Sequence, residues 1–371
     1  MTAPAVSRSG SGTVDAGAST PSPGDAAGRR TTGDDAAKVL VVAPSWIGDT
    51  LMMQPLLTLL KAREPGVRIE VLAPDWSAPL LGRMAEVDAV IENPFAHGEF
   101  KGRARRALGR RLAKADFQRA YILPNSWKSA LVPFFARIPH RIGYHGEARW
   151  GLLNDRRKID AKVHPRLVQR YALLAGPLPD PLPAPALASS PAQQAAARES
   201  LGLPADASPV VFCPGAEFGP AKRWPAAHFA ALARMLSAKV SPGATAPIWL
   251  IGSDKDAAVG DEIERLSDGA ARNLCGRTTL EQAIDLIAGA RLVVSNDSGL
   301  MHVAAALGRR LLALYGSSSP EYTPPLSPRA RVLSRGMKCS PCFKRECPLG
   351  HFDCLNGLMP EAVAAEATEL S

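Results

Sequence analysis

Short apolar runs alternate along this chain with longer stretches in which the apolar residues recur every three or four positions. Short runs without a polar interruption are typical of strands that are buried on both faces of a parallel sheet, whereas the longer stretches have the periodicity of helices. In the first half of the chain this pattern predicts strands at 38–43, 68–73, 89–91 and 119–123, with helices between them.

Two helices of this half can be placed more closely. One covers residues 51–61, where Pro55 either lies near the helix start or kinks it. The other begins near Ser126, and its apolar side chains should be buried. We expect this of Ala130, Leu131, Phe134 and Phe135.

The same alternation returns in the second half. Thr279, with Gln282 three residues later, has the spacing of a capping box at a helix start. Two such alternations predict an α/β protein with two Rossmann-like, doubly wound domains, whose ligands bind in the cleft at the carboxyl ends of the strands. Here we expect strands at 210–213, 248–251, 291–295 and 310–315, and helices at 225–239, 257–266, 280–288 and 300–307.

A proline-rich segment separates the two halves. Five prolines fall within the nine residues 177–185, and this density favours an extended, semi-rigid linker. Residues 1–37 hold almost only small residues, proline and scattered charges, so they cannot offset the entropy of ordering. We therefore expect a disordered extension at 1–37, domains at 38–176 and 193–335, a linker at 177–192, and a cysteine-rich segment with a C-terminal helix at 336–371.

The composition of the 371 residues is that of an ordinary globular protein, long enough for two domains. No run of about 18 uncharged apolar residues is present, and the N-terminus lacks the apolar core of a signal peptide. We therefore expect a cytoplasmic protein without a transmembrane anchor.

The net charge of +9 points to an acidic partner. A nucleic acid, anionic lipid headgroups or a phosphorylated glycan would each suit it, and a merely solvated helix face is the plainer alternative. The excess charge gathers in two clusters, namely Lys101, Arg103, Arg105, Arg106, Arg110, Arg111 and Lys114, and then Arg137, His140, Arg141, His145, Arg149, Arg156, Arg157 and Lys158.

The loop Ser45-Trp-Ile-Gly-Asp49 lies where the first strand ends and a helix begins. A glycine there allows an anion or a sugar to approach the helix N-terminus closely. Asp49 would face the cleft, although an aspartate at this point also commonly caps a helix. The dinucleotide fingerprint G-x-G-x-x-G is missing, which disfavours a dehydrogenase.

Three loops of the second half begin where a predicted strand ends. In the first, residues 213–225, Lys222 or Arg223 could neutralise a phosphate, or the loop could simply pack Trp224 on the domain. In Gly252-Ser253-Asp254 the carboxylate could receive ribose hydroxyls or cap a helix.

The third loop is the sharpest pattern, Asn296-Asp-Ser-Gly-Leu-Met-His302. Ser298 and Gly299 would offer N–H and hydroxyl donors to a phosphate, with His302 one turn further along the helix. Alternatively His302 is a core histidine and Asp297 a helix cap.

Four cysteines, Cys339, Cys342, Cys347 and Cys354, lie within sixteen residues near the C-terminus. The spacing of the first two suits zinc, but a second C-x-x-C pair is missing. Reduced cysteines that pack a loop are the alternative, since the cytosol disfavours disulfides.

Several of these segments resemble the heptosyltransferase II family of glycosyltransferase family 9. The matching segments are 41–49, 123–135, 151–155, 213–225, 296–306, 315–320 and 323–325. The resemblance covers roughly residues 38–335. It implies a GT-B fold and inverting, metal-independent transfer of heptose from ADP-heptose to the first heptose of the lipopolysaccharide inner core, carried by Kdo and lipid A. No cofactor is implied. A peripheral position at the inner face of the cytoplasmic membrane is implied, without nucleic acid as a partner.

The resemblance also implies site residues. Asp49 would be the general base and Lys222 would bind the phosphates. The ribose carboxylate aligns poorly, so that Asp254 and Asp256 both remain open. Donor binding is expected of Gly215, Glu217, Lys222, Gly252, Ser253, Asp254, Asp297, Ser298, Gly299, Leu300 and His302, and acceptor binding of Trp46, Gly48, Asn125, Ser126, Lys128 and Arg141.

Three other functions stay open on the sequence. The loops would also suit another acceptor step or a related transferase with another nucleotide-sugar. Charge alone supports a nucleic-acid-binding protein, and the cysteines alone support a zinc-dependent one.

Overall fold

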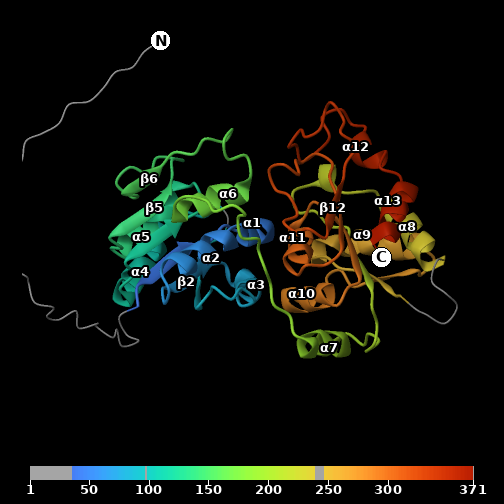
Figure 1. Cartoon of the computed structure of the whole chain (residues 1–371), viewed down its shortest axis with the longest axis horizontal. Helices are drawn as coiled ribbons and strands as arrows, with labels where there is room; N and C mark the ends of the chain where they lie inside the picture. Colours follow the sequence, from blue (N-terminus) through green and yellow to red (C-terminus); the bar gives the residue numbers. More distant parts are fainter. Residues whose placement is uncertain (1–35, 97, 239–245, 371) are drawn as a thin grey trace, which may run out of the picture. The chain divides into compact units, whose positions relative to one another are not determined.

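A computed structural model describes residues 36–96, 98–238 and 246–370 (Figure 1). Residues 37–371 cluster into one compact unit. Apart from Ala36 and Ala37, the extension expected at 1–37 lies outside the described residues.

Two six-stranded sheets organise the described chain, and all of their strand pairs are parallel. The first has the order β3(Ala89–Glu92), β2(Arg68–Ala73), β1(Lys38–Val42), β4(Arg119–Ile122), β5(His140–Tyr144), β6(Asp155–Arg157). The second has the order β12(Ala330–Leu333), β11(Leu311–Leu314), β10(Leu292–Asn296), β7(Val210–Cys213), β8(Ile248–Leu250), β9(Ala271–Asn273). Counted within each sheet, both orders are 3-2-1-4-5-6, so the predicted pair of Rossmann-like folds is confirmed.

Helices connect the strands of both sheets (Figure 1). The α-helices are α1(Ile47–Met52), α2(Gln54–Arg63), α3(Ala78–Leu81), α4(Gly102–Leu112), α5(Leu131–Phe135), α6(Leu167–Ala172), α7(Pro191–Ser200), α8(Ala226–Ala238), α9(Ala257–Leu266), α10(Leu280–Ala288), α11(Gly299–Ala306), α12(Asp353–Asn356) and α13(Pro360–Leu370). Short 3-10 helices are η1(Asp75–Ser77), η2(Ala113–Ala115), η3(Trp127–Ala130), η4(Leu173–Ala175), η5(Pro220–Lys222) and η6(Asp254–Asp256). Within the described residues, no helix has the length and apolar character needed to cross a membrane.

Alternate side chains of each central strand enter different cores, because successive residues of a strand point to opposite faces. In β1, Val39 and Val41 pack in the core that includes α1 and α2, whereas Leu40 and Val42 pack in the core that includes α4 and α5. Helices therefore cover both faces of this sheet. The first of these cores also takes in α10 and α11, so it extends from one sheet to the other.

The apolar runs located the central strands well. Strands 68–73 and 210–213 and helices 257–266 and 280–288 are confirmed to the residue, and Thr279 forms the predicted capping box with Gln282. The pattern did not locate β5, β6, β9 and β12. Three of them are outer strands with sequences such as Asp-Arg-Arg, and β5 also begins with two polar residues, so none contains a long apolar run.

Two predictions about the first half need correction. The single helix expected at 51–61 is two helices, because α1 ends at Met52 and α2 begins at Gln54 with Pro55 in its first turn. Phe134 was expected to be buried but is 39% exposed, and Phe135 is only partly buried. Helix α5 has only five residues, about one and a half turns, so its last residues reach the surface.

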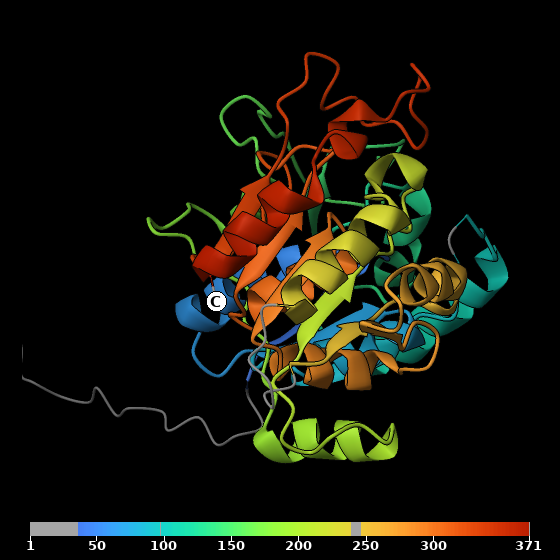
Figure 2. The same cartoon turned by 90° about the vertical axis from the view of Figure 1, so that its right-hand side faces the viewer.

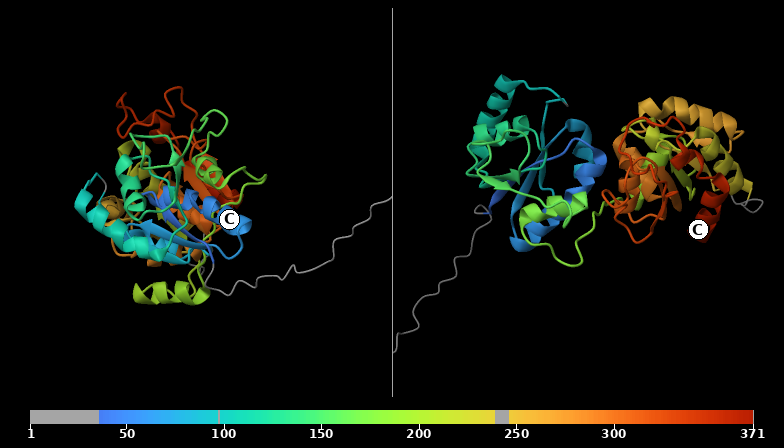
Figure 3. Two further views of the ribbon diagram at one scale, coloured as in Figure 1. Left: turned by 90° about the vertical axis from the view of Figure 1, so that its left-hand side faces the viewer. Right: turned by 90° about the horizontal axis from the view of Figure 1, so that it is seen from above.

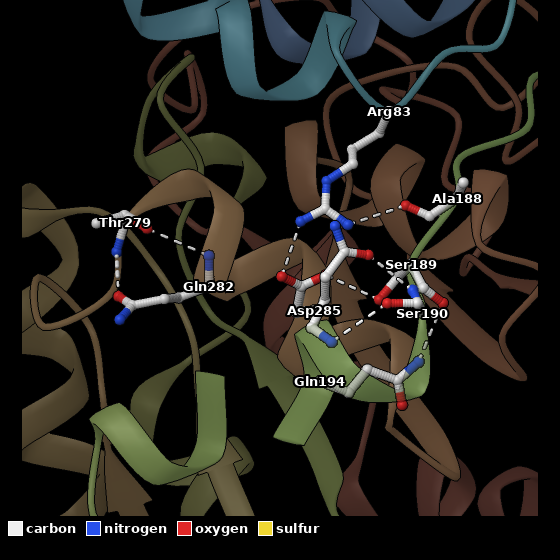
Figure 4. A network of polar contacts seen from close by, with 9 residues as sticks. Arg83, Ala188, Ser189, Ser190, Gln194, Thr279, Gln282 and Asp285 are labelled. Carbon is white, nitrogen blue, oxygen red and sulfur yellow. Dashed lines mark hydrogen bonds and ion pairs between the residues drawn. The ribbon is translucent and has the colours of Figure 1, made fainter. Parts of the chain in front are cut away.

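One polar network links residues from the first half with residues from the second (Figure 4). Arg83 follows α3 and donates to Asp285 of α10 at 2.8 Å, and both side chains are nearly buried. Asp285 also accepts from Ser189 at 2.8 Å, in the segment before α7. Residues 177–190 contain neither helix nor strand, and the domain and linker boundaries given above stay predictions.

The C-terminal residues pack back on the second half. Helix α13 lies beside α8, as Figure 2 shows in red and yellow. The indole Nε1 of Trp224 donates to the carbonyl of Leu358 at 2.8 Å, just before α13. The end of the chain therefore supports the loop that carries Lys222.

Candidate active site

Helices α1 and α11 pack together (Figures 1 and 3). Three loops that sequence analysis singled out meet beside them. Asp49 follows β1, Lys222 follows β7, and Asp297 follows β10. These strands flank the points at which the strand order reverses, which is where ligands bind in open α/β sheets.

Two glycines allow the close approach of α1 and α11. A Cβ atom on Gly48 would lie 2.7 Å from Cδ2 of His302, and one on Gly299 would lie 2.8 Å from Cβ of Ile47. Separations this short exclude any side chain without a shift of the neighbour. The two glycines thus hold Asp49 close to the loop of Asp297.

Lys222 and Asp297 form an ion pair. The Nζ of Lys222 donates to Oδ2 of Asp297 at 2.6 Å, and the two side chains are 17% and 4% exposed. Lys222 also lies over the ring of Phe218, 5.1 Å from its centroid. Ser298 caps α11 by accepting from the backbone N–H of Met301, so Asp297 is not the cap.

The Asp49 carboxyl group is largely shielded from water. Burial raises its pKa to about 6, with Lys222 acting in the opposite direction and Asp297 adding to the rise. Asp49 is the third residue of α1 and makes no capping bond, which excludes the capping role. A carboxylate with this pKa accepts a proton well near neutral pH.

His302 is buried one turn into α11. Its Nε2 lies 4.0 Å from Oδ1 of Asp297. Burial lowers its pKa to about 4, so the imidazole is neutral at physiological pH. His302 therefore packs against Asp297 as a neutral polar side chain and does not pair with it as a cation.

Hydrogen bonds hold the loop that carries Lys222 both before and after this residue. The buried Asn296 side chain accepts from the N–H of Trp224 at 3.0 Å and donates to the carbonyl of Pro214 at 2.7 Å. From the cysteine-rich segment, the carbonyl of Arg345 accepts from the N–H of Ala221 at 3.0 Å. Sequence analysis had not assigned this segment a place near Lys222.

Glycines 215 and 252 make room for Asp256. A Cβ on Gly215 would lie 2.3 Å from Oδ2 of Asp256, and one on Gly252 would lie 2.9 Å from its Cβ. Asp256 is buried and accepts from both the N–H and the hydroxyl of Ser253. Asp254 is exposed beside it, and Glu217 pairs with Lys255 at 2.6 Å. Of the two aspartates, only Asp254 is free of these internal bonds.

A cavity of about 570 Å³ opens at the carboxyl ends of β1, β4 and β5. Four of the six residues expected to bind the acceptor line it, together with Asp49. Gly48 does not line the cavity and lies against the ring of His302 instead. The four are Trp46, Asn125, Ser126 and Lys128.

Arg141, for which the resemblance also implied acceptor binding, does not line this cavity. It is the second residue of β5, at the amino end of the strand, whereas the cavity lies at the carboxyl ends. Its Nε donates to the carbonyl of Leu152 at 2.7 Å and its Nη1 to that of Ile138 at 2.5 Å.

Several residues of the cavity were missed by sequence analysis. Arg105 is buried, with its guanidinium 4.1 Å from the Phe95 ring centroid and bonded to three carbonyls. The Oδ1 of Asn93 is buried and has no hydrogen-bond partner among the described residues. Tyr322 reaches the cavity from the second half, where its carbonyl accepts from Leu167 at 3.0 Å.

The loop after β11 holds two more missed groups. The hydroxyls of Ser317 and Ser318 are buried and find no partner among the described residues. They lie at the carboxyl edge of the second sheet, and a run of serines after a buried strand was the signal that could have pointed to them.

The four C-terminal cysteines surround one very small cavity, together with His351. All four are free of disulfides. Within the described part of the chain, no three histidine, cysteine or acidic side chains are placed so that they could hold a metal ion. The structure thus gives the zinc interpretation no support.

Comparison with known proteins decides the family. A family model described as glycosyltransferase family 9 (heptosyltransferase) matches residues 105–353. The chain belongs to glycosyltransferase family 9. Lipopolysaccharide heptosyltransferase 2 of Salmonella typhimurium is 45% identical to this family 9 chain over 90% of the chain and 98% of the relative. Lipooligosaccharide heptosyltransferase 2 of Haemophilus influenzae is 46% identical over 80% and 88%.

A solved structure agrees. The ADP-heptose LPS heptosyltransferase II of E. coli matches this family 9 chain with a TM-score of 0.80 at 44% identity, over 90% of this chain and 98% of that one. The predicted family and the GT-B fold are therefore confirmed, and the protein is a glycosyltransferase.

Proposed function

We propose that this enzyme is a heptosyltransferase II. It would transfer L-glycero-D-manno-heptose from ADP-heptose to the first heptose of heptosyl-Kdo2-lipid A. The relatives that carry this name are 43–46% identical in the better matches. The observation that carries the chemistry is the position of Asp49. It lines the cavity of about 570 Å³, which we call the acceptor-side cavity, and its pKa responds to the charges of Lys222 and Asp297.

In the proposed reaction the acceptor hydroxyl attacks the anomeric carbon from the face opposite the ADP group. Its oxygen forms the new glycosidic bond as the bond between the anomeric carbon and the diphosphate breaks. The hydroxyl proton goes to the Asp49 carboxylate, and the bonding electrons leave with ADP. General-base assistance of this kind contributes about 10²–10⁴-fold to the rate.

The donor would bind across the second sheet. Lys222 and the N–H groups of Ser298 and Gly299 at the start of α11 would hold the diphosphate and stabilise its developing charge. Leu300 and His302 would support that helix end. Asp254 would accept hydrogen bonds from the ribose hydroxyls, because the carboxylate of Asp256 already accepts two from Ser253. Gly215, Glu217, Gly252 and Ser253 would complete the nucleotide side.

The acceptor would occupy the cavity of about 570 Å³. Trp46, Asn125, Ser126 and Lys128 would contact its sugars, with Gly48 keeping α1 in place. Lys128 and Arg105 supply positive charge for the carboxylates of Kdo and for phosphates. We further propose that the enzyme works from the cytoplasm, in peripheral contact with the inner face of the membrane that holds this acceptor, and that it needs no metal cofactor.

A transfer assay tests the proposal. Purified enzyme, with EDTA present, is given ADP-heptose and either heptosyl-Kdo2-lipid A or Kdo2-lipid A. We expect transfer to the first acceptor only, and loss of transfer in Asp49→Asn while ADP binding, measured by calorimetry, persists. Transfer only to Kdo2-lipid A would contradict the acceptor. Loss of wild-type activity with EDTA would contradict the metal-free mechanism.

A further inference from the structure

A second hollow, of about 510 Å³, lies between α4 and α5 on the first half of the chain. Its polar side chains are all arginines. Arg106 and Arg110 come from α4, Arg137 from the turn after α5, and Arg141 from the start of β5. Ala113, Phe134 and Phe135 complete the lining.

The close packing of α4 on α5 brings these charges together. A Cβ on Gly109 would lie 2.5 Å from Cβ of Phe135, so only glycine fits there. Arg106 and Arg110 are four residues apart and therefore share one face of α4. None of the four arginines has a carboxylate partner among the ion pairs of the described residues. Like charges that converge without a counter-charge repel one another, which an anionic ligand would relieve.

Aromatic rings accompany the guanidinium groups. Arg106 lies over Phe135 at 6.0 Å and Arg141 over Phe134 at 5.6 Å from the ring centroids. These guanidiniums cover ring faces on which a nucleic-acid base would have to stack. Phe134 is nevertheless 39% exposed. An exposed apolar ring among cations is typical of surfaces that lie in the headgroup region of a membrane.

The cationic surface extends beyond the hollow. Arg103, Arg111 and Lys114 are exposed on or just after α4, and no ion pair of the described residues includes them. Arg105, in the same helix, points the other way and lines the acceptor-side cavity. Helix α4 thus has one arginine toward the acceptor-side cavity and the others toward the surface.

We propose that the arginine groove, formed by Arg106, Arg110, Arg137, Arg141 and Phe134, docks this enzyme on a bilayer by binding the phosphate groups of anionic phospholipids. The inference names the membrane-contacting face that the proposed function requires, and to that extent it rests on the proposed function. It also gives Arg141 a role in lipid binding, in place of the acceptor binding that the resemblance implied.

Vesicle co-sedimentation tests the groove without donor or acceptor. The full chain is mixed with vesicles of phosphatidylcholine alone or with added phosphatidylglycerol. We expect binding to the anionic vesicles only. Each cation near such a surface is worth about 1 kcal/mol, so Arg106→Gln/Arg110→Gln should weaken binding about 30-fold. The matched control Arg265→Gln/Arg272→Gln removes two exposed arginines from α9 and β9 and should bind like wild type.

Three outcomes would overturn the proposal: equal loss of binding in the groove variant and its control, no binding of wild type to anionic vesicles, or a short oligonucleotide bound more tightly than the vesicles. Inorganic phosphate at the same total phosphate as the lipid should not displace the enzyme, and displacement would indicate a site for free phosphate instead. Unchanged thermal melting of the groove variant confirms that it folds.

A transfer assay separates this inference from the proposed function. With the acceptor dispersed in detergent, the groove variant should keep wild-type rates, whereas with the acceptor in anionic vesicles it should be about tenfold slower or more. Vesicle binding that depends on the groove, together with no heptosyl transfer by wild type, would leave the docking face standing and refute the function.

Discussion

The ammonium group of Lys222 lies 2.6 Å from the carboxylate of Asp297, although the two residues are on different loops of the second sheet. Both side chains are largely buried, so each depends on the other to balance its charge. A phosphate that enters between them would share this lysine with Asp297. The pair therefore offers a way to separate the contribution of Lys222 to stability from the role in donor binding that we propose for it.

Replacing Lys222 by Met should leave Asp297 buried without its counter-charge. Breaking a buried pair typically costs about 3–5 kcal/mol, and thermal unfolding would measure it. In the double variant Lys222→Met/Asp297→Asn most of that stability should return, because no lone charge is left. Transfer should remain at least about 100-fold reduced, because the double variant lacks the cation that we propose for the donor phosphates. Recovery of activity along with stability would show that Lys222 acts only structurally.

The raised pKa of Asp49 predicts the acid limb of the pH profile. In the proposed reaction Asp49 is the base and must be deprotonated, so kcat/KM should rise with pH up to about 6 and then level off. Asp49→Asn should remove this limb along with most of the activity. A wild-type profile that levels off near the ordinary pKa of aspartate would contradict the buried environment.

The same pKa predicts an effect on stability. The folded state holds the Asp49 proton more tightly than the unfolded chain, whose pKa is near 3.8, so stability should fall as pH rises from about 4 to about 6. Asp49→Asn lacks this term and should melt at a temperature equal to or higher than wild type at about pH 8, with a smaller difference near pH 4. Differential scanning calorimetry at both pH values measures it, and a lower melting temperature of the variant at the higher pH would contradict it.

Gly48→Ala should disturb the contact between α1 and α11. The new Cβ would meet the His302 ring at 2.7 Å, so one helix must shift and move Asp49. A displacement of about 1 Å can cost about 100-fold in rate. Gly82→Ala is the control, because its Cβ would meet nothing closer than 3.4 Å, and it should retain wild-type transfer. Wild-type transfer by Gly48→Ala would show that the two loops need not stay this close.

The ion pair of Arg83 and Asp285 should contribute strongly to stability, since both groups are nearly buried (Figure 4). We expect Arg83→Met to lower the free energy of unfolding by about 3–5 kcal/mol. Lys255→Met breaks the exposed pair with Glu217 and should cost less than about 1 kcal/mol. Urea titration of both variants gives the comparison. Equal losses would contradict the ranking by burial.

The sequence was most informative where one local rule decides the structure. Val39–Val42 and Val210–Cys213 are buried on both faces, so an unbroken apolar run suffices to identify them. Strand β6, with the sequence Asp-Arg-Arg, is held by pairing with β5, and its residues carry no such signal. Loops at the ends of the central strands could likewise be selected as site candidates, because topology places every such loop at one edge.

What the sequence could not give was which distant residues join those loops. Tyr322 lines the cavity that holds Asp49 because its segment is bonded to Leu167, 155 residues earlier in the chain. Arg141, expected to bind the acceptor, lies at the amino end of β5 and does not line that cavity. Such placements depend on strand direction and long-range packing, and neither is encoded near the residue itself.

The bond from Ala221 to the carbonyl of Arg345 has a consequence for how the protein is made. Protein synthesis proceeds from the N-terminus, and domains fold as they emerge. The loop of Lys222 is translated more than a hundred residues before the segment that holds it, and Leu358, the partner of Trp224, comes later still. The nascent chain can thus assemble both sheets while the loop of Lys222 still lacks these supports. A chain that ends before Arg345 would keep the strands of both sheets, but it would lack these two supports and also Leu355, Leu358 and Val363, which pack in the core beside Trp224.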